Sequence, residues 1–290
     1  MKLITIDLDG TLLNSNHQIS NKDICTIKKA QSFGVTVVIS TGRTFDSAKS
    51  ILENYNIVVP YIITCNGSII NDFSGNILYS FPVDKSSLEK VISFLHFNNY
   101  YFSLASSDSR IFPKYNKNIL MADFYEAKIS NPDLKEEDLD NLINLFYDGK
   151  TFDGKVFNNI QDIISTEEDI YGICAVSFSN EKLENGIKSF KDIKNLSIFK
   201  SAYNNFELIN KNSSKGQAAK LLCNHLGIDL KDTMAIGDNQ NDLSMFEIVQ
   251  FSVAMENAYD SIKEKCSFVT LNNNSSGVGH AIENILELTV

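Results

Sequence analysis

The chain has no long apolar run, no paired cysteine motif and no excess of positive charge. None of its apolar stretches reaches the roughly 18 residues that a membrane span needs, so we expect no membrane association. Its five cysteines are scattered without a Cys-x-x-Cys pair, which argues against a thiolate metal site. The formal charge of −10 disfavours nucleic acid as a partner, because phosphate backbones bind basic surfaces.

The N-terminus also lacks the features of a secretory signal peptide. Lys2 is followed directly by a strand-like segment that contains Asp7 and Asp9. We therefore expect reduced thiols and a cytoplasmic location. The 290 residues, 43% of them hydrophobic and 21% charged, are typical of a globular protein that is long enough for two domains. No obligate protein partner is evident.

Arginine and histidine are scarce. Arg43 and Arg110 are the only arginines, so almost all basic charge comes from lysine. The histidines match no metal-ligand spacing, and we expect them to be structural or at the surface; they are His17, His96, His225 and His280.

The most informative segment is MKLITIDLDGTLL at residues 1–13. Its apolar residues suit a strand that is buried on both faces, as parallel sheets require. Side chains two apart on a strand share a side, so Asp7 and Asp9 are expected to emerge together where the strand ends. Gly10 permits a sharp turn there, and the Thr11 hydroxyl can fix it. Taken alone, the motif also fits a solvated turn or a helix cap.

Strand-like and helical segments alternate in both halves of the chain. The strand-like segments are residues 3–8, 61–67, 251–255 and 268–271, a strand through Ile39 that ends in the polar residues 40–43, and a strand within 233–242 that runs into a polar loop. Helical patterns separate them, including one after Ser20, one after Ser213 and one near the C-terminus. This alternation predicts an α/β fold with a doubly wound, Rossmann-like parallel sheet, whose ligands bind at the carboxyl ends of the strands.

The middle of the chain follows a different pattern. A helix over 84–98 and paired short strands within 100–112 precede a polar, irregular stretch that runs to about Lys155. A strand, a helix and two more strands then fill 172–210. This order predicts an inserted α+β domain with an antiparallel sheet over 84–207, and a discontinuous core of 1–83 and 208–290. Four aromatic residues near the start of the insertion could line a pocket, but core packing suits most of them better; they are Tyr100, Tyr101, Phe102 and Phe112.

Four polar clusters are expected at one edge of the core sheet. They are Asp7 with Asp9, Thr41 with Gly42, Lys215, and Asp238 with Asp242. Taken singly, Lys215 suits a solvated helix, Thr41 a helix cap and Asp242 a helix N-terminus. Together they supply what cleavage of a phosphate monoester requires.

Each cluster can take one role in that chemistry. Asp7 can attack phosphorus and form an aspartyl-phosphate. Asp9 can protonate the leaving oxygen and then deprotonate the attacking water, which requires its pKa to rise in the complex. The Thr41 hydroxyl, the Gly42 amide and the Lys215 ammonium can bind the phosphate oxygens. The last cluster offers carboxylate oxygens to Mg²⁺, which favours oxygen ligands and commonly bridges protein and substrate phosphate.

The order of these motifs resembles the haloacid dehalogenase (HAD) superfamily of phosphatases, in its Cof-like branch with a type IIB cap. The matching positions are Asp7, Asp9, Gly10 and Thr11; Thr41 to Arg43; Asn66 and Gly67; Lys215 and Gly216; and Gly237, Asp238, Asn241, Asp242 and Met245. The resemblance implies metal ligation by Asp7, the Asp9 backbone carbonyl and Asp238, with Asp242 in or near the ligand set. It also implies that Arg43 and Asn241 belong to the phosphate site. One departure stands out: Glu256 replaces the usual glycine of a Met-Gly-Asn-Ala pattern.

The sequence therefore predicts a Mg²⁺-dependent phosphatase of small phosphorylated metabolites, most simply sugar phosphates, whose inserted cap excludes water and selects the leaving group. Two alternatives remain at this stage. A phosphomutase would return the phosphoryl group to its substrate, and a non-catalytic sensor would bind a phosphorylated ligand without turnover.

Overall fold

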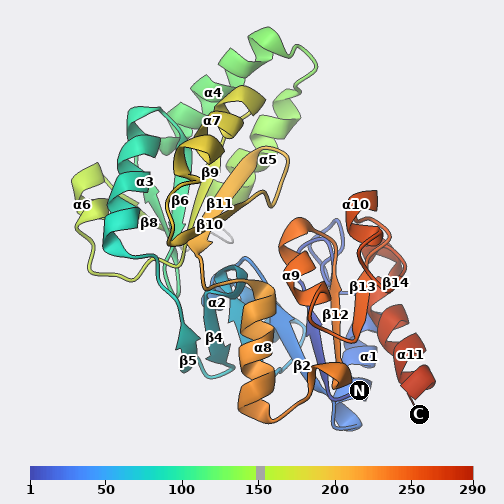
Figure 1. The fold of residues 1–290 in the computed structure, drawn as a ribbon. Coiled ribbons are helices and arrows are strands. Elements are labelled where there is room, and N and C mark those ends of the chain that lie inside the picture. The colour runs from blue at the N-terminus through green and yellow to red at the C-terminus, as the bar shows by residue number, and fades with distance from the viewer. Residues whose placement is uncertain (148–153, 290) are drawn as a thin grey trace. The chain divides into compact units, whose positions relative to one another are not determined.

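The computed structural model describes residues 1–147 and 154–289. The chain divides into two compact units (Figure 1). We call Met1–Ser80 with Asn212–Val290 the core unit, and Phe81–Lys211 the inserted unit. None of the described helices is long and apolar enough to cross a bilayer.

Within the described residues, the core unit is built on an eight-stranded sheet of order β14-β13-β12-β1-β2-β3-β4-β5. Its strands are β1 (Leu3–Ile6), β2 (Thr36–Ser40), β3 (Tyr61–Thr64), β4 (Ile69–Asp72), β5 (Ile77–Ser80), β12 (Thr233–Gly237), β13 (Phe251–Ala254) and β14 (Phe268–Val269). The strands from β14 to β3 are parallel, which confirms the predicted α/β class. The antiparallel hairpin of β4 and β5 was not predicted. It turns at Gly75, where φ is 101°, and the Asp72 carboxylate accepts the amides of Ser74 and Asn76.

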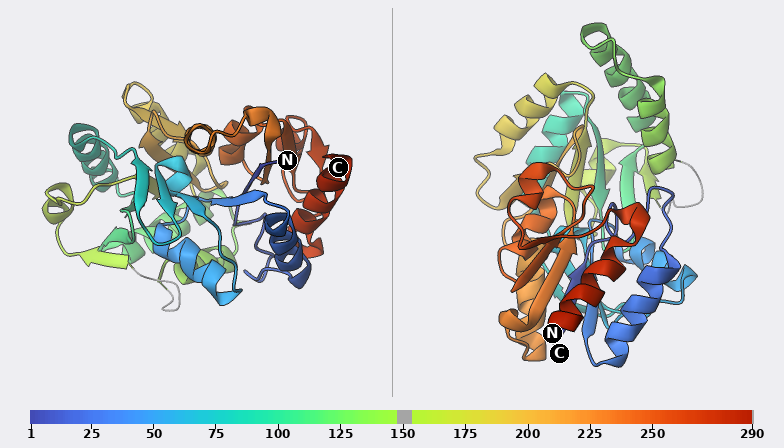
Figure 2. Two further views of the ribbon diagram at one scale, coloured as in Figure 1. Left: turned by 90° about the horizontal axis from the view of Figure 1, so that it is seen from below. Right: turned by 90° about the vertical axis from the view of Figure 1, so that its right-hand side faces the viewer.

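Helices cover both faces of the core sheet. The first face carries α1 (Asn21–Ser32), α2 (Phe45–Asn54) and α11 (Gly277–Thr289). The second carries α8 (Lys215–Leu226), α9 (Leu243–Phe246) and α10 (Asp260–Lys263). Ile4 and Ile6 pack toward the first set and Leu3 toward the second, so β1 is buried on both sides. The terminal helices α1 and α11 lie side by side in every view (Figure 2).

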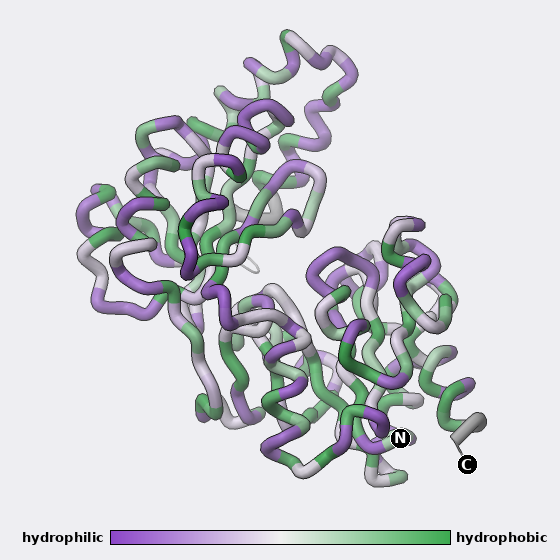
Figure 3. The backbone as a smooth tube through the Cα atoms, in the orientation of Figure 1, coloured by the Kyte–Doolittle hydropathy of each residue, from purple (hydrophilic) through white to green (hydrophobic). Residues whose placement is uncertain are grey.

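Local sequence signals set the helix ends. The Ser20 hydroxyl accepts the Asp23 amide at the start of α1, and the Ser214 hydroxyl accepts the Gln217 amide at the start of α8. Gly227 ends α8 in the left-handed conformation. Hydrophobic residues concentrate on the central strands that these helices cover (Figure 3).

In its described residues, the inserted unit contains a six-stranded sheet of order β10-β11-β9-β6-β7-β8. Its strands are β6 (Tyr101–Ala105), β7 (Arg110–Pro113), β8 (Gly154–Phe157), β9 (Gly172–Val176), β10 (Leu196–Phe199) and β11 (Asn205–Asn210). All neighbours are antiparallel except β7 and β8. One face packs on α3 (Lys85–Phe97), α6 (Ile160–Ile164) and α7 (Asn180–Phe190).

The irregular stretch predicted up to about Lys155 is wrong for most of its length. It contains α4 (Asn116–Ser130) and α5 (Glu136–Tyr147), which cover the other face of the sheet. Leu120, Phe124 and Ala127 form a narrow buried stripe on α4, while polar residues fill the rest of that helix and mask its period. Residues 148–153 of the same stretch lie outside the described residues. The four aromatic residues named above, Tyr100, Tyr101, Phe102 and Phe112, belong to the core of the inserted unit, since each is at most 2% exposed.

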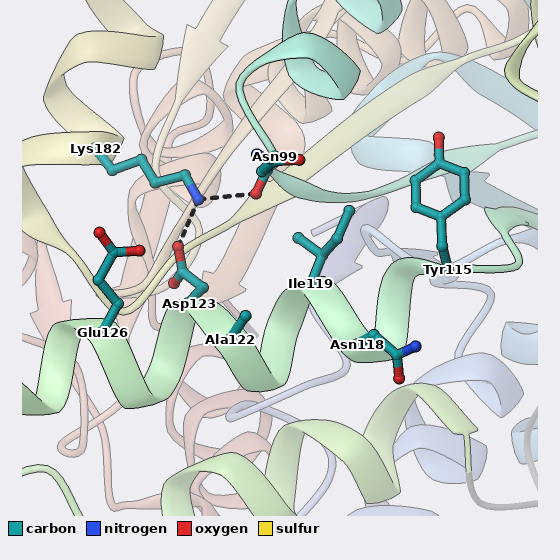
Figure 4. A pocket seen from close by; sticks show the side chains of 8 residues that line it. All are labelled: Asn99, Tyr115, Asn118, Ile119, Ala122, Asp123, Glu126 and Lys182. Carbon is teal, nitrogen blue, oxygen red and sulfur yellow. Dashed lines mark hydrogen bonds and ion pairs between the residues drawn. The ribbon is translucent and has the colours of Figure 1, made fainter.

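A cavity of about 380 Å³ lies between α4 and α7 in the inserted unit (Figure 4). The Asp123 carboxylate on its wall accepts hydrogen bonds from the Ser177 hydroxyl, the Phe178 amide and the Lys182 ammonium. Lys182 also donates to the Asn99 carbonyl, and its Nζ lies 4.9 Å from the centre of the Tyr100 ring. These bonds connect α4 to α7 and to the segment that joins β9 and α7. We therefore interpret the ion pair of Asp123 and Lys182 as structural.

We expect Lys182→Ala to lower the free energy of unfolding by about 2 kcal/mol, because Asp123 is 5% exposed and would lose its cation. Urea denaturation of the variant measures this loss. The control is Lys200→Ala, which removes the exposed pair with Glu184 and is expected to cost less than about 1 kcal/mol. Equal losses in the two variants would contradict the structural role of the buried pair.

Candidate active site

The two aspartates of the first motif lie beyond the end of β1 and have different surroundings. The Asp7 amide donates to the Ile236 carbonyl of β12, and its side chain is 7% exposed. The Asp9 side chain is 48% exposed. Gly10 turns the chain with φ at 80°, and a Cβ there would lie 2.5 Å from an Asp238 carboxylate oxygen. Only glycine therefore lets this turn approach Asp238.

Lys215 begins α8 and is buried among carboxylates. Its Nζ lies 2.5 Å from Asp7 Oδ1 and 2.7 Å from Asp242 Oδ1. Burial alone would lower the pKa of this ammonium, but the charges and hydrogen bonds of Asp242 and Asp7 raise it above the usual value. Close packing fixes the lysine: a Cβ on Gly216 would lie 1.8 Å from the Ser244 carbonyl oxygen.

Asp7, Asp238 and Asp242 form a carboxylate cluster, each offering an oxygen within 4.8 Å of the others. Burial raises the pKa of Asp7 well above its ordinary value; Lys215 opposes the rise, and the charges of Asp242 and Asp238 add to it. Burial and the charge of Asp242 raise the pKa of Asp238 to about 6. The cluster thus carries more negative charge than Lys215 alone offsets.

The Asp242 carboxylate already has donors on both oxygens. Oδ1 accepts Lys215 Nζ, and Oδ2 accepts the backbone amides of Asp238 and Asn239, each at 3.0 Å. Asp238 has a different partner, because the Thr11 hydroxyl donates to its Oδ1 at 2.7 Å. The polar loop after β12 is therefore folded around Asp242, while Asp238 contacts the turn that follows β1.

Arg43 forms a bidentate ion pair with the Asp9 carboxylate. Its Nε lies 2.7 Å from Oδ2 and its Nη2 lies 2.7 Å from Oδ1. Burial alone would raise the pKa of Asp9, but the hydrogen bonds and charge of Arg43 lower it below its ordinary value. The sequence assigns Arg43 to phosphate; the structure gives it Asp9 as a partner.

The loop Thr41–Arg43 follows β2, and the buried Thr41 hydroxyl accepts the Arg43 amide at 3.2 Å. Asn241 Nδ2 donates to Asn66 Oδ1 at 2.9 Å. All the predicted site residues belong to the core unit. Asp7, Lys215, Asp238 and Asp242 form one cluster, Asp9 pairs with Arg43, and Asn241 contacts Asn66.

Asparagines to which the sequence analysis gave no role hold the turn after Asp9. Asn257 Nδ2 donates to the Gly10 carbonyl at 2.8 Å, and Asn273 Nδ2 donates to the Leu13 carbonyl at 2.9 Å. Glu256, the departure from the branch pattern, accepts Asn272 Nδ2 at 3.1 Å. For Asn272 and Asn273 the only local signal was the run of asparagines after β14, and by composition it predicts no more than a loop.

The whole chain matches known proteins. The sequence model of the haloacid dehalogenase-like hydrolase family matches residues 4–282. The chain belongs to this family. The phosphatase YwpJ of Bacillus subtilis is 36% identical to it over 99% of this chain and 100% of that protein. The 5-amino-6-(5-phospho-D-ribitylamino)uracil phosphatase YwtE of the same species is 34% identical over 99% and 98%.

A solved structure shares the fold of this HAD-like hydrolase. The HAD subclass IIB sugar phosphatase BT4131 superposes with a TM-score of 0.80, covering 98% of this chain and 99% of that chain at 19% identity. The family match and the named relatives confirm the predicted superfamily and make the protein a phosphatase, that is, a phosphoric monoester hydrolase.

We expect the metal-free protein to lose stability as pH rises from about 4 to about 6. The folded state keeps the Asp238 proton up to about pH 6, whereas the ordinary value is 3.8. The folded protein therefore binds more protons than the unfolded chain in this window, and the free energy of unfolding falls as pH rises. Urea titrations in a chelating buffer measure the slope. Asp238→Asn should reduce it, and an unchanged slope would contradict the charge excess of the cluster.

Proposed function

We propose that the chain is a Mg²⁺-dependent phosphatase of small phosphorylated metabolites that works through an aspartyl-phosphate on Asp7. The observation that carries this proposal is the buried Lys215 ammonium between Asp7 and Asp242, beside the Asp238 carboxylate. It combines a nucleophile, a fixed positive charge and oxygen ligands at one sheet edge.

Asp7 suits the role of nucleophile. Its backbone is anchored to β12 and Lys215 holds one of its carboxylate oxygens, so the carboxylate has a single orientation. In the proposed first step, a bond forms between an Asp7 oxygen and phosphorus while the bond to the leaving oxygen breaks. Water then attacks the same phosphorus and releases phosphate and Asp7.

Asp9 is the proposed acid and base of the two steps. It would give a proton to the leaving oxygen and take one from the attacking water. Arg43 holds it ionised in the structure. The first step therefore requires that the Arg43 guanidinium turn away from Asp9, and the phosphate oxygens are its natural anionic partner.

The proposed phosphate donors are the Thr41 hydroxyl, the Gly42 amide, the Lys215 ammonium and the Asn241 amide. Of these, Lys215 carries the charge, and its burial keeps its electrostatic effect strong because water does not screen it.

The donor set fits Mg²⁺. Three carboxylates and one ammonium leave two formal negative charges; burial is the main cause of the raised pKa values of Asp7 and Asp238, and the neighbouring carboxylates add to it. Mg²⁺ bound there would offset these charges and help to neutralise the incoming phosphate. We assign the ligands to Asp7, Asp238 and the Asp9 backbone carbonyl. We place Asp242 beside the metal ligands, because its carboxylate already accepts three hydrogen bonds. These bonds suit it to fixing Lys215 and the backbone at Asp238.

We further propose that the inserted unit serves as a cap that selects the leaving group. The fold shared with a subclass IIB sugar phosphatase and the name of YwtE, a phosphatase of a phosphorylated ribityl compound, support a small phosphorylated polyol or sugar as substrate.

Phosphate release from a panel of phosphorylated metabolites, with and without Mg²⁺, tests the proposal. We expect Mg²⁺-dependent release that Asp7→Asn abolishes, because the nucleophile is lost. The control is Asp260→Asn, which changes an aspartate whose side chain is 92% exposed and should leave turnover unchanged. Full turnover by Asp7→Asn would disprove the nucleophile, and isomerised products without free phosphate would indicate a mutase.

We expect Asp9→Asn to separate the two chemical steps. The leaving group of p-nitrophenyl phosphate needs no proton, so the first step should persist while hydrolysis of the intermediate slows by about 10² to 10⁴. Stopped-flow absorbance should then show a burst of nitrophenolate equal to the enzyme concentration. Loss of turnover without a burst would argue against the aspartyl-phosphate or against this role of Asp9.

A further inference from the structure

The turn between β3 and β4 has an unusual backbone. Cys65 and Asn66 have φ values of 49° and 56°, and Gly67 follows with φ at 95°. Two successive residues other than glycine in the left-handed region are costly, by an amount on the order of 1 kcal/mol or more each. Neither residue has a role in the chemistry proposed above, so the function so far does not explain this strain.

The backbone of this turn holds the loop that follows β2. The Cys65 amide donates to the Arg43 carbonyl at 2.9 Å, and the Asn66 amide donates to the Thr41 carbonyl at 3.0 Å. Both donors are amides of the two left-handed residues. The strained turn thus fixes the position of the Thr41–Arg43 loop.

The same turn packs against the start of α8. A Cβ on Gly67 would lie 2.1 Å from the Ser214 carbonyl oxygen and 2.6 Å from the Lys215 amide nitrogen. The turn therefore contacts the segment from which the buried lysine projects.

The Asn66 side chain contacts two of the proposed phosphate donors. It is buried, at 3% exposed, and its Oδ1 accepts Asn241 Nδ2 at 2.9 Å. Its amide also lies against Gly42, where an added Cβ would be 3.1 Å from Asn66 Oδ1. The hydrogen bond between Asn66 and Asn241 fixes the orientation of the Asn241 amide group, because it engages Asn241 Nδ2. Asn241 Oδ1 is buried without a hydrogen-bond partner in the described residues, so the bond to Asn66 sets that orientation.

We propose that Asn66 is a positioning residue for phosphate: its amide orients Asn241 and supports Gly42, without touching the reacting atoms. This inference rests on the proposed phosphatase function. It explains why an asparagine occupies a left-handed position where glycine would cost less: the backbone needs the conformation, and the phosphate site needs the amide.

The test compares Asn66→Gly with Asn66→Ala. Glycine keeps the left-handed backbone and removes the amide, whereas alanine removes the amide and strains the backbone. Asn56→Gly is the matched control, since Asn56 has φ at 52° and is exposed in the turn after α2. The readouts are the dissociation constant of inorganic phosphate in the presence of Mg²⁺ by calorimetry, kcat and KM for the best substrate, and Tm.

We expect both Asn66 variants to bind phosphate about ten-fold more weakly, as for the loss of one oriented hydrogen-bond donor to a charged group. The value of kcat/KM should fall by a similar factor. Only Asn66→Ala should also lower Tm, by about 2–4 °C. Asn241→Ala should show the same loss of affinity, and its combination with Asn66→Gly should lose little more.

Wild-type phosphate affinity in Asn66→Gly would overturn the proposal, since glycine would then have supplied all that the position needs. Fully additive losses in the double variant would overturn the route through Asn241. If the wild type released no phosphate from any metabolite, the proposed function would fail; weaker phosphate binding by Asn66→Gly would still support the positioning role. A wild type that bound no phosphate would overturn both.

Discussion

The site is organised around one buried ion cluster, the Lys215 ammonium between Asp7 and Asp242. An ammonium that is 1% exposed is stable only if its charge is compensated nearby, and each of these carboxylates in turn depends on it. Asp7 comes from the end of β1, Lys215 from the start of α8 and Asp242 from the loop after β12. Three distant segments therefore have to meet for any one charge to be tolerated, so the active site also constrains the fold of the core unit.

Close backbone approach makes this meeting possible. A Cβ on Gly216 would collide with the Ser244 carbonyl, and one on Gly237 would lie 2.4 Å from the Asp242 carboxyl carbon. The glycines of the motifs thus admit neighbouring chain segments, and the charged residues beside them supply the chemistry. Glycines and charged residues are neighbours in these motifs because the charges can pair only where the backbones pack tightly.

Much of this arrangement could be predicted from the sequence, for identifiable reasons. Buried parallel strands and motifs at their carboxyl ends are local patterns, so the core sheet and the clustering of Asp7, Lys215 and Asp238 followed from them. The pairing of Arg43 with Asp9 did not, because the choice between a carboxylate and a phosphate depends on three-dimensional distance. Helix α4 was missed because its buried stripe is narrow among polar residues. The support that Asn257 and Asn273 give to Gly10 and Leu13 spans about 250 residues and leaves no periodic signal.

The pKa values of the two aspartates of the first motif are shifted against their proposed roles. Asp7 must be ionised to attack, yet burial raises its pKa; Asp9 must carry a proton, yet Arg43 lowers its pKa. Bound ligands would correct both pKa shifts. A dication beside Asp7 would favour its ionised form, and a phosphate dianion that draws Arg43 away would let the pKa of Asp9 rise. The ligands of the reaction thus complete the charge balance of the site and would shift both pKa values toward the proposed roles.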